Sequence, residues 1–234
     1  MIGIFDSGVG GFCAYRRVRE LLPREEILYL ADTKNAPYGT KTEDEIKRLT
    51  EKNIKILRSA GADEILIACC SASSIHHLLS EEDRAASTPI ILPASEQAAR
   101  VGRKIAVIAT RHTASSHAFG KAIAELCDTS VTEMAEQELV SLVESGNRDG
   151  RIDRNCRRYL RAMAGRIKET EADCLILGCT HFSHLKGEIG RLLPKLKIIS
   201  PADVGAEVIV KKCRMLNAEC RMLNAEPDFP KRET

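Results

Sequence analysis

Two cysteines at equivalent points of a repeated pattern are the strongest sign of chemistry in this chain. Cys69 and Cys179 each follow an acidic residue, a short apolar run and a small residue, and they lie 110 positions apart. The same offset, without a gap, pairs Ala62 with Ala172. This self-similarity indicates an internal repeat in which each half places one thiol at the end of a strand.

A matched pair of thiols suits one kind of reaction. Inversion of a stereocentre by proton transfer needs a base on one face of the carbon and an acid on the other, and a thiolate and a thiol can exchange these roles. The alternative is that both cysteines are small core residues, because free cysteine is among the most buried residue types. The polar residues Ser71, Thr180 and His181 follow the two thiols closely and favour the chemical interpretation.

Composition limits the classes of function that remain open. The chain has 234 residues, 44% hydrophobic and 29% charged, which is enough for one large or two small domains. The formal net charge of +2 comes from mixed charges without a long basic run, so we expect no nucleic-acid partner. No apolar run reaches the length of a membrane span, and the N-terminus turns polar at Asp6. We therefore expect no membrane partner and a cytoplasmic location.

The nine cysteines do not form a recognisable metal or disulfide pattern. Their odd number and the expected reducing compartment argue against a disulfide framework. No C-x-x-C pair is present, and a closed zinc site needs four ligands, so we expect no metal.

Short apolar runs alternate with helical patterns along the chain. Strands are predicted at residues 2–5, 27–30, 65–68, 90–92, 104–108, 130–134, in the run that ends at Cys179, and at 196–199. After the first strand a helical pattern runs through Tyr15 and Leu22, and further helices are predicted at residues 41–60, 73–80, 94–100, 113–126 and 153–168. This alternation predicts an α/β fold with mostly parallel sheets flanked by helices on both faces.

The first strand ends in a glycine-rich turn that reads Asp6-Ser7-Gly8-Val9-Gly10-Gly11 and leads into a helix. Such a turn is able to hold an anion on backbone N–H groups, although the spacing matches neither the P-loop nor the G-x-G-x-x-G pattern. Asp6 falls at the carboxyl end of a strand, where open α/β sheets place ligand-binding groups. A role for Asp6 as a helix cap is the alternative, and the local sequence does not decide between the two.

The second strand is followed by a loop, residues 31–40, that is longer than a simple turn requires, and long polar loops are often binding loops. The offset of 110 maps this loop onto residues 141–150, so Glu144 is expected in a corresponding loop of the second half.

The C-terminal segment contains a perfect tandem copy, residues 213–219 and 220–226. Seven residues are two helical turns, so the copy is expected to extend a helix and nearly keep its face. A role in self-association is a hypothesis, and residues 227–234 are expected to fray.

Four motifs in register give the chain a recognisable resemblance. The chain resembles the cofactor-independent glutamate racemases in its segments Phe5-Asp6-Ser7-Gly8-Val9-Gly10-Gly11, Ala36-Pro37-Tyr38-Gly39, Ala68-Cys69 and Gly178-Cys179-Thr180-His181-Phe182. The resemblance extends to about residue 210. Aspartate racemases usually carry a glutamate at the position of His181, and related decarboxylases keep a single cysteine, so glutamate racemases are the favoured branch.

The resemblance implies two pseudo-symmetric domains with the active site in the cleft between them. We expect one domain at residues 1–95 together with 203–234, and the other at 96–202. It also implies a homodimer that needs no cofactor and converts glutamate, with D-glutamate supplied to peptidoglycan.

The resemblance also assigns expected roles to individual residues. Cys69 and Cys179 match the acid and base thiols, Asp6 and His181 match the groups that assist them, and Glu144 matches a further acidic residue near the second thiol. The expected substrate contacts are Ser7, Pro37, Tyr38, Gly39, Cys70, Ser71 and Thr180.

One departure from the family pattern concerns substrate specificity. The family normally has Asn-Thr after its first catalytic cysteine, and this chain has Cys70 and Ser71. Loss of an amide costs about 1–3 kcal/mol if a polar substrate group is left unpaired. Two alternatives therefore stay open: a racemase of another small amino acid, or a non-catalytic relative that binds a ligand or a protein.

Overall fold

Two parallel sheets of four strands form the centre of the molecule. The computed structural model describes residues 1–146 and 152–223. Both sheets have the same order of strands, β2-β1-β3-β4 and β6-β5-β7-β8. The strands are β1 (Ile2–Asp6), β2 (Ile27–Ala31), β3 (Glu64–Ile67), β4 (Ser87–Pro89), β5 (Lys104–Ala109), β6 (Ser130–Ala135), β7 (Cys174–Gly178) and β8 (Lys197–Ile199). The shared order confirms the predicted fold class and the internal repeat.

The central strands are apolar along their length because helices cover both faces of each sheet. β1 and β7 are buried at every residue, and β5 is buried except at Lys104. Parallel strands in such a position are typically rich in valine, isoleucine and leucine. The outer strand β2 is only half-buried throughout, as expected at the edge of a sheet.

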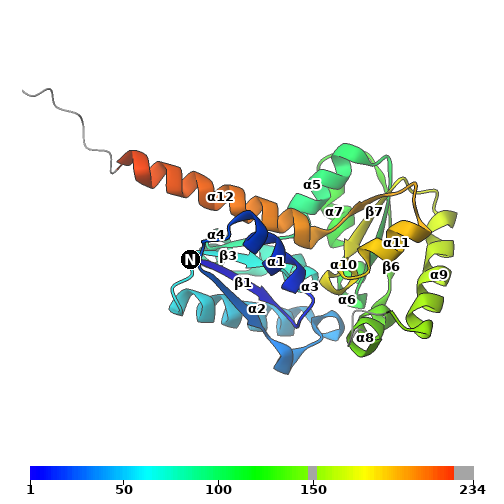
Figure 1. Ribbon diagram of the computed structural model, residues 1–234, viewed down its shortest axis with the longest axis horizontal. Coiled ribbons are helices and arrows are strands. Elements are labelled where there is room, and N and C mark those ends of the chain that lie inside the picture. The colour runs from blue at the N-terminus through cyan, green and yellow to red at the C-terminus, as the bar shows by residue number, and fades with distance from the viewer. Residues whose placement is uncertain (147–151, 224–234) are drawn as a thin grey trace, which may run out of the picture.

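Helices connect consecutive strands and provide the covering layers (Figure 1). In the first half they are α1 (Phe12–Leu21), α2 (Glu43–Ser59), α3 (Cys70–Ser74), α4 (Glu81–Ala85) and α5 (Ile91–Val101), with short 3₁₀ turns at Thr33–Asn35, Tyr38–Thr40 and His76–Leu78. In the second half they are α6 (Arg111–Ser115), α7 (Ala118–Ala124), α8 (Gln137–Gly146), α9 (Arg154–Glu169), α10 (Thr180–Ser183) and α11 (Lys186–Leu192), and α12 (Pro201–Leu223) ends the described chain.

The two long surface helices begin at capping residues that the sequence supplies. α2 starts with a capping box, in which Thr42 accepts from the backbone N–H of Glu45 and the Glu45 carboxylate accepts from that of Thr42. α9 starts at Asp153, whose carboxylate accepts from the backbone N–H of Cys156 at 2.6 Å. The predicted helices at 41–60 and 153–168 are confirmed within a few residues.

Three predicted elements are wrong in their boundaries or type. Residues 90–92 are not a strand: β4 ends at Pro89, and the apolar run belongs to the first turn of α5, where Pro93 is tolerated because early N–H groups have no helical partner. The predicted helix at 113–126 is divided into α6 and α7 by His117, whose φ of 52° is left-handed. The predicted helix at 73–80 is the short α3 followed by a 3₁₀ turn.

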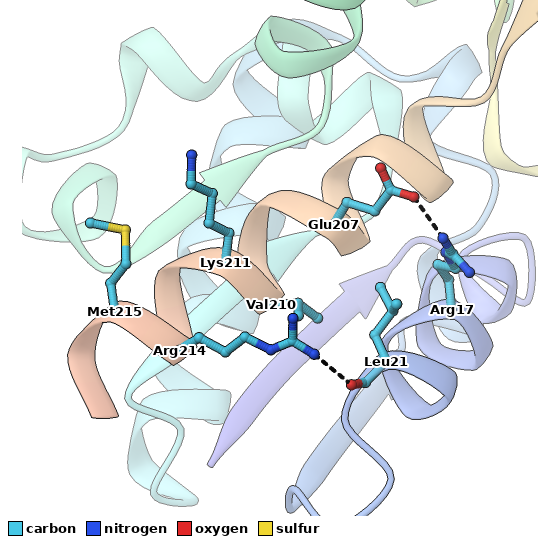
Figure 2. Close-up of a pocket in the computed structure, with 7 residues that line it drawn as sticks. All are labelled: Arg17, Leu21, Glu207, Val210, Lys211, Arg214 and Met215. Carbon is cyan, nitrogen blue, oxygen red and sulfur yellow. Dashed lines mark hydrogen bonds and ion pairs between the residues drawn. The ribbon is translucent and has the colours of Figure 1, made fainter. Parts of the chain in front are cut away.

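The last helix returns from the second sheet and packs on the first half. α12 contacts α1, α5 and β3, and Figure 1 shows it running along the first sheet and projecting past it. An open groove of about 400 Å³ lies between α1 and α12, and the residues that line it are drawn in Figure 2. There Arg17 pairs with Glu207 at 2.7 Å, and Arg214 donates to the carbonyl of Leu21 at 3.1 Å. The predicted helix extension is confirmed as far as Leu223, and the frayed end predicted for residues 227–234 lies outside the described residues.

An apolar cluster joins the two halves. It contains Ile4 of β1, Ile105 of β5, Phe119 of α7 and Ile209 of α12, all fully or almost fully buried. Within residues 1–146 and 152–223, no helix is long and apolar enough to cross a membrane. The same residues contain no group of three or more His, Cys, Asp or Glu side chains placed to hold a metal ion.

Candidate active site

The polar side chains of the site follow the carboxyl ends of the central strands. Asp6 is the last residue of β1, Cys69 lies two residues after β3 and caps α3, and Cys179 directly follows β7 and caps α10. β1 and β3 are neighbours in the first sheet, as β5 and β7 are in the second. This is the edge at which open parallel sheets place ligands, so the fold supports the predicted position of all three residues.

A hydrogen bond between Asp6 and Thr180 brings the two halves together at this edge. The Thr180 hydroxyl donates to Asp6 Oδ1 at 3.1 Å, and the backbone N–H of Gly8 donates to Asp6 Oδ2 at 3.0 Å. Asp6 has no exposed surface, and burial raises the pKa of its carboxyl even though nearby His181 acts in the opposite direction. α1 begins at Phe12 with Gly11 as its cap, so Asp6 is not the helix cap that the sequence left open.

Cys69 lies in the first half beside Ser7. Its Sγ donates to Ser7 Oγ at 3.6 Å, and its side chain is only 5% exposed. Burial, followed by the negative charge of Asp6, raises the pKa of the Cys69 thiol to about 12. The thiol form is therefore the stable form of Cys69 at neutral pH.

Cys179 lies in the second half beside a polar chain of side chains. Its Sγ is 3.7 Å from Nδ1 of His181, and Nε2 of the same imidazole is 3.0 Å from Oε1 of Glu144. Burial lowers the pKa of His181, but the bonds to Cys179 and Glu144 outweigh it and raise that pKa to about 11. His181 is thus cationic at neutral pH and places its positive charge beside the second thiol.

The two catalytic candidates Cys69 and Cys179 influence one another electrostatically. The charge of Cys179 is among the influences that raise the pKa of Cys69, and it is also among those that raise the pKa of Cys70. Cys179 is 6% exposed, so both cysteines are buried.

The glycine-rich turn packs directly on the second thiol's neighbours. A Cβ added at Gly10 would lie 2.6 Å from the Thr180 hydroxyl oxygen and 2.7 Å from Nδ1 of His181. A Cβ at Gly11 would lie 2.6 Å from Cβ of Asp6. The two glycines are needed for this close approach of backbone to side chains.

The loop of residues 36–39 contributes a buried tyrosine and a second contact between the halves. The Tyr38 hydroxyl donates to Asp32 at 2.5 Å and accepts from Asn53 at 3.0 Å, and burial raises its pKa. Gly39 lies against Thr110 of the second half, where an added Cβ would be 2.5 Å from the threonine Cβ. Pro37 is exposed.

The two positions after Cys69 have different surroundings. Ser71 is buried, and its Oγ is 3.0 Å from the hydroxyl of Thr110 and 3.2 Å from that of Thr113, both in the second half. Cys70 is 2% exposed and packs in the apolar cluster that joins the halves, and burial raises its pKa well above the ordinary value.

Comparison with known proteins identifies the family of this chain. The model of the Asp/Glu/Hydantoin racemase family matches residues 13–209. The chain belongs to this family. It is 37% identical over 206 residues to the glutamate racemase of Gloeobacter violaceus, covering 86% of this chain and 76% of the relative. It is 36% identical over 207 residues to that of Desulforudis audaxviator, covering 86% and 74%.

Solved structures of racemases share the architecture. Glutamate racemase isoform RacE1 from Bacillus anthracis aligns with a TM-score of 0.81 at 27% identity, over 94% of this chain and 82% of that one. Glutamate racemase from Francisella tularensis in complex with D-glutamate aligns with a TM-score of 0.79 at 27% identity, over 97% and 84%. The resemblance stated from the sequence motifs is confirmed.

The structure of this racemase-family chain corrects one expectation about Glu144. The ungapped offset of 110 places Glu144 in a loop, but Glu144 lies in α8. Asp6 pairs with Ala31 across β1 and β2, and Ala109 pairs with Ala135 across the equivalent strands β5 and β6. Asp6 therefore corresponds to Ala109 and Ala31 to Ala135, so the offset between the two halves is shorter than 110 residues in this part of the repeat. The expected closeness of Glu144 to the second thiol holds through His181.

Sequence reasoning missed four polar residues that position the site. Asp32 and Asn53 hold Tyr38, while Thr110 and Thr113 hold Ser71. Thr110 directly follows β5, so the strand-end rule that identified Asp6 applies to it as well. Asn53 carried a different signal, since it is a polar residue on the buried face of α2.

Proposed function

We propose that this chain interconverts L- and D-glutamate by moving the α-proton between Cys69 and Cys179, and that it supplies D-glutamate for peptidoglycan. Relatives named glutamate racemase and the solved neighbour in complex with D-glutamate support this substrate. The observation that carries the proposal is the placement of one thiol after each of the equivalent strands β3 and β7, each with its own polar partner.

The different surroundings of the two thiols suggest which acts first. In the proposed reaction Cys179, beside cationic His181, acts first as the base, and Cys69, whose thiol form is favoured, acts as the acid. The thiolate removes the α-proton from one face, the electron pair of the C–H bond remains on the α-carbon, and Cys69 donates its proton to the opposite face. The reverse reaction exchanges the two roles, with Asp6 assisting Cys69.

An amino acid's α-proton is far less acidic than a thiol, so the site must stabilise the carbanion. Fixed donors in a site that excludes water provide this stabilisation. Ser7 and Thr180 carry buried hydroxyls beside the two thiols, and Ser71 lies in a buried group of hydroxyls. We assign the substrate contacts to Ser7, Pro37, Tyr38, Gly39, Cys70, Ser71 and Thr180.

Substrate entry requires the two halves to separate. Asp6 and Thr180 are in direct contact across the edge of the sheets, and Gly10 lies close to His181. Opening of this contact admits glutamate, and closure then excludes water from the reacting carbon.

The proposal includes a domain division and an assembly. Residues 1–95 with 203–234 form one domain and residues 96–202 the other, with the chain acting as a cytoplasmic homodimer. Packing of α12 on α1 and β3 supports the return of the chain to the first domain. Light scattering of the purified chain measures its mass in solution, and a mass of one chain at micromolar concentration contradicts the dimer.

A second candidate substrate follows from Cys70. This residue presents a buried thiol among apolar side chains, so it supplies no amide to a polar substrate group. A racemase of another small amino acid fits this feature. Screening single amino acids for α-proton exchange in heavy water distinguishes the substrates.

The decisive experiment for the proposed function follows L- and D-glutamate by circular dichroism with the purified protein in heavy water. We expect the circular dichroism signal to fall to zero from either enantiomer, and we expect the product to carry deuterium at its α-carbon. Binding of glutamate without any exchange at the α-carbon contradicts the proposal and indicates a non-catalytic relative.

A further inference from the structure

The outward face of α9 carries a row of arginines. Arg154, Arg157, Arg158 and Arg161, here called the arginine row, are exposed and recur at the spacing that places side chains on one face of a helix. They line an open groove of about 510 Å³. α9 contains six basic residues and one acidic residue among its 16, although the chain's formal net charge is only +2.

Unlike Arg17, Arg58 and Arg166, the arginine row pairs with no carboxylate of residues 1–144 and 152–216. Arg17 pairs with Glu207 in the groove of Figure 2, and Arg58 pairs with Glu82. Arg166, also on α9, pairs with the buried Glu136 at 2.7 Å.

The position of the row is unfavourable for the helix that carries it. Guanidinium groups three and four residues apart repel one another, and those in the first turns oppose the positive end of the helix dipole. The nearby carboxylate of Asp153 accepts from a backbone N–H of the helix. A bound polyanion would relieve both the repulsion and the opposed dipole, which indicates that the row serves binding.

The surroundings of the row identify the kind of anion. The apolar face of α9, with Leu160, Met163 and Ile167, is buried in the core, and none of the exposed large apolar side chains of the described residues lies on α9. The row therefore lacks the apolar anchors of a protein interface or a membrane-inserting helix. Tyr159 packs against the core of the second half and donates its hydroxyl to Glu136, so it does not offer a free ring for stacking on single-stranded bases.

We propose that the arginine row binds the phosphodiester backbone of double-stranded nucleic acid without sequence preference. Guanidinium groups bind phosphate oxygens with two parallel hydrogen bonds. The row spans about 10 Å of helix, over which a duplex presents about six phosphate charges. α9 lies at the edge of the molecule, away from the first sheet, so a duplex reaches it without blocking that half (Figure 1). We expected no nucleic-acid partner because the net charge is near zero. That net charge is a sum over the whole chain, so it does not reveal the positive charge concentrated on this face of α9.

The test measures binding of a fluorescein-labelled 20-base-pair DNA duplex to the full chain by fluorescence anisotropy across a series of salt concentrations. Four phosphate contacts predict a slope of about −3.6 for log affinity against log salt, which is a loss on the order of 100-fold between 50 and 200 mM. The variant R154Q/R157Q/R158Q/R161Q is expected to lose at least about tenfold in affinity and most of the salt slope. Its glutamate racemisation should remain that of the unaltered chain, which also shows that the variant is folded.

A matched control removes the same number of charges elsewhere. Arg48, Lys52 and Lys55 are exposed on α2 in a groove that also contains carboxylates, and Arg100 is exposed on α5. The variant R48Q/K52Q/K55Q/R100Q should keep its duplex affinity. Equal loss in both variants, or no duplex binding at 50 mM salt, overturns the proposal. It is also overturned if polyglutamate or vesicles of anionic lipid depend on the row while the duplex does not.

Discussion

Burial favours the neutral form of Asp6, and this makes the free energy of unfolding depend on pH. Because burial raises its folded pKa above the ordinary 3.8, the unfolded chain releases the proton at lower pH than the folded chain. The free energy of unfolding therefore falls as pH rises through and above 3.8. Replacing the Asp6 carboxyl with a side chain that does not ionise should remove this loss of stability at neutral pH.

We predict that Asp6→Asn raises the melting temperature at pH 7 and that the gain disappears as the pH falls below 3.8, where both states hold the neutral acid. Racemisation should fall on the order of 100-fold, because assistance to Cys69 is lost. Thermal unfolding over a pH series checks the first effect and circular dichroism of glutamate the second. A variant less stable than the unaltered chain at pH 7 contradicts the burial argument.

Glu144 acts on Cys179 only through His181, and this gives a second prediction. Its bond to Nε2 is one of the influences that raise the pKa of His181. Glu144→Gln should lower that pKa, as measured by NMR titration of the imidazole protons, with His181→Asn used to assign the resonance. Glu138→Gln, an exposed glutamate on the same helix, serves as control. An unchanged titration in Glu144→Gln shows that the contact does not form in solution.

The sequence identified site residues at the ends of strands, but it did not identify the residues that hydrogen-bond to other site residues and position them. Cys69, Cys179 and Asp6 were identifiable because a strand pattern preceded each of them. Asp32 and Asn53 were not, because their role depends on the path of a loop that folds back over α2. Contacts between distant segments have no local sequence signal.

At the scale of elements, the glycine-rich turn sets the distance between the first half and α10. Gly10→Ala places a methyl group 2.6 Å from the Thr180 oxygen and 2.9 Å from the backbone N of His181, so the turn or α10 must shift. We predict a loss of about 1–3 kcal/mol in the free energy of unfolding and a fall in racemisation of at least about tenfold. Urea unfolding and circular dichroism measure the two effects.

Gly165 offers the matched control for this substitution. It lies in the interior of α9, and an added Cβ meets no atom within 4 Å. Gly165→Ala should therefore stabilise the chain by about 0.5–1 kcal/mol without a change in activity. If Gly10→Ala and Gly165→Ala change stability and activity to the same extent, the lack of space for a side chain at Gly10 does not explain its effect.

Element prediction succeeded where periodicity was long and failed where short runs were ambiguous. The amphipathic α2 and α9 have caps and extended apolar faces, so their limits were predicted within a few residues. The run at 90–92 is apolar in either structure, and the proline on each side of it was consistent with a strand or a helix start. The break at His117 depends on packing of α7, which the sequence does not display.

At the scale of the whole molecule, the bond between Thr180 and Asp6 couples the two halves. Thr180→Val preserves side-chain shape but leaves Asp6 without this donor. We predict a loss of about 1–3 kcal/mol and faster modification of Cys69 by a thiol reagent, because the halves open more often. Thr132→Val, at an exposed position of β6, should change stability by less than about 0.5 kcal/mol. Equal thiol reactivity in the two variants contradicts the coupling.

The duplicated architecture explains why one chain is able to present two similar groups to both faces of a carbon atom. Each sheet places its thiol after the third strand of its half, and β3 and β7 occupy the same position in the strand order. The surroundings differ, with Ser7 and Asp6 beside Cys69 and with His181 and Glu144 beside Cys179. The repeat thus provides symmetric geometry, and the neighbouring residues give the two thiols different polar partners.

The most direct test of the two-thiol reaction is α-proton exchange of separate L- and D-glutamate in heavy water by Cys69→Ala and Cys179→Ala, followed by NMR. Neither variant should racemise glutamate, because each lacks the group on one face. Each should still exchange deuterium into one enantiomer only, on the face of its remaining thiol, and the two variants should act on opposite enantiomers. Exchange by Cys179→Ala should be the slower, because Cys69 favours its thiol form. Racemisation at the unaltered rate by either variant, or exchange of both enantiomers by one of them, contradicts the account.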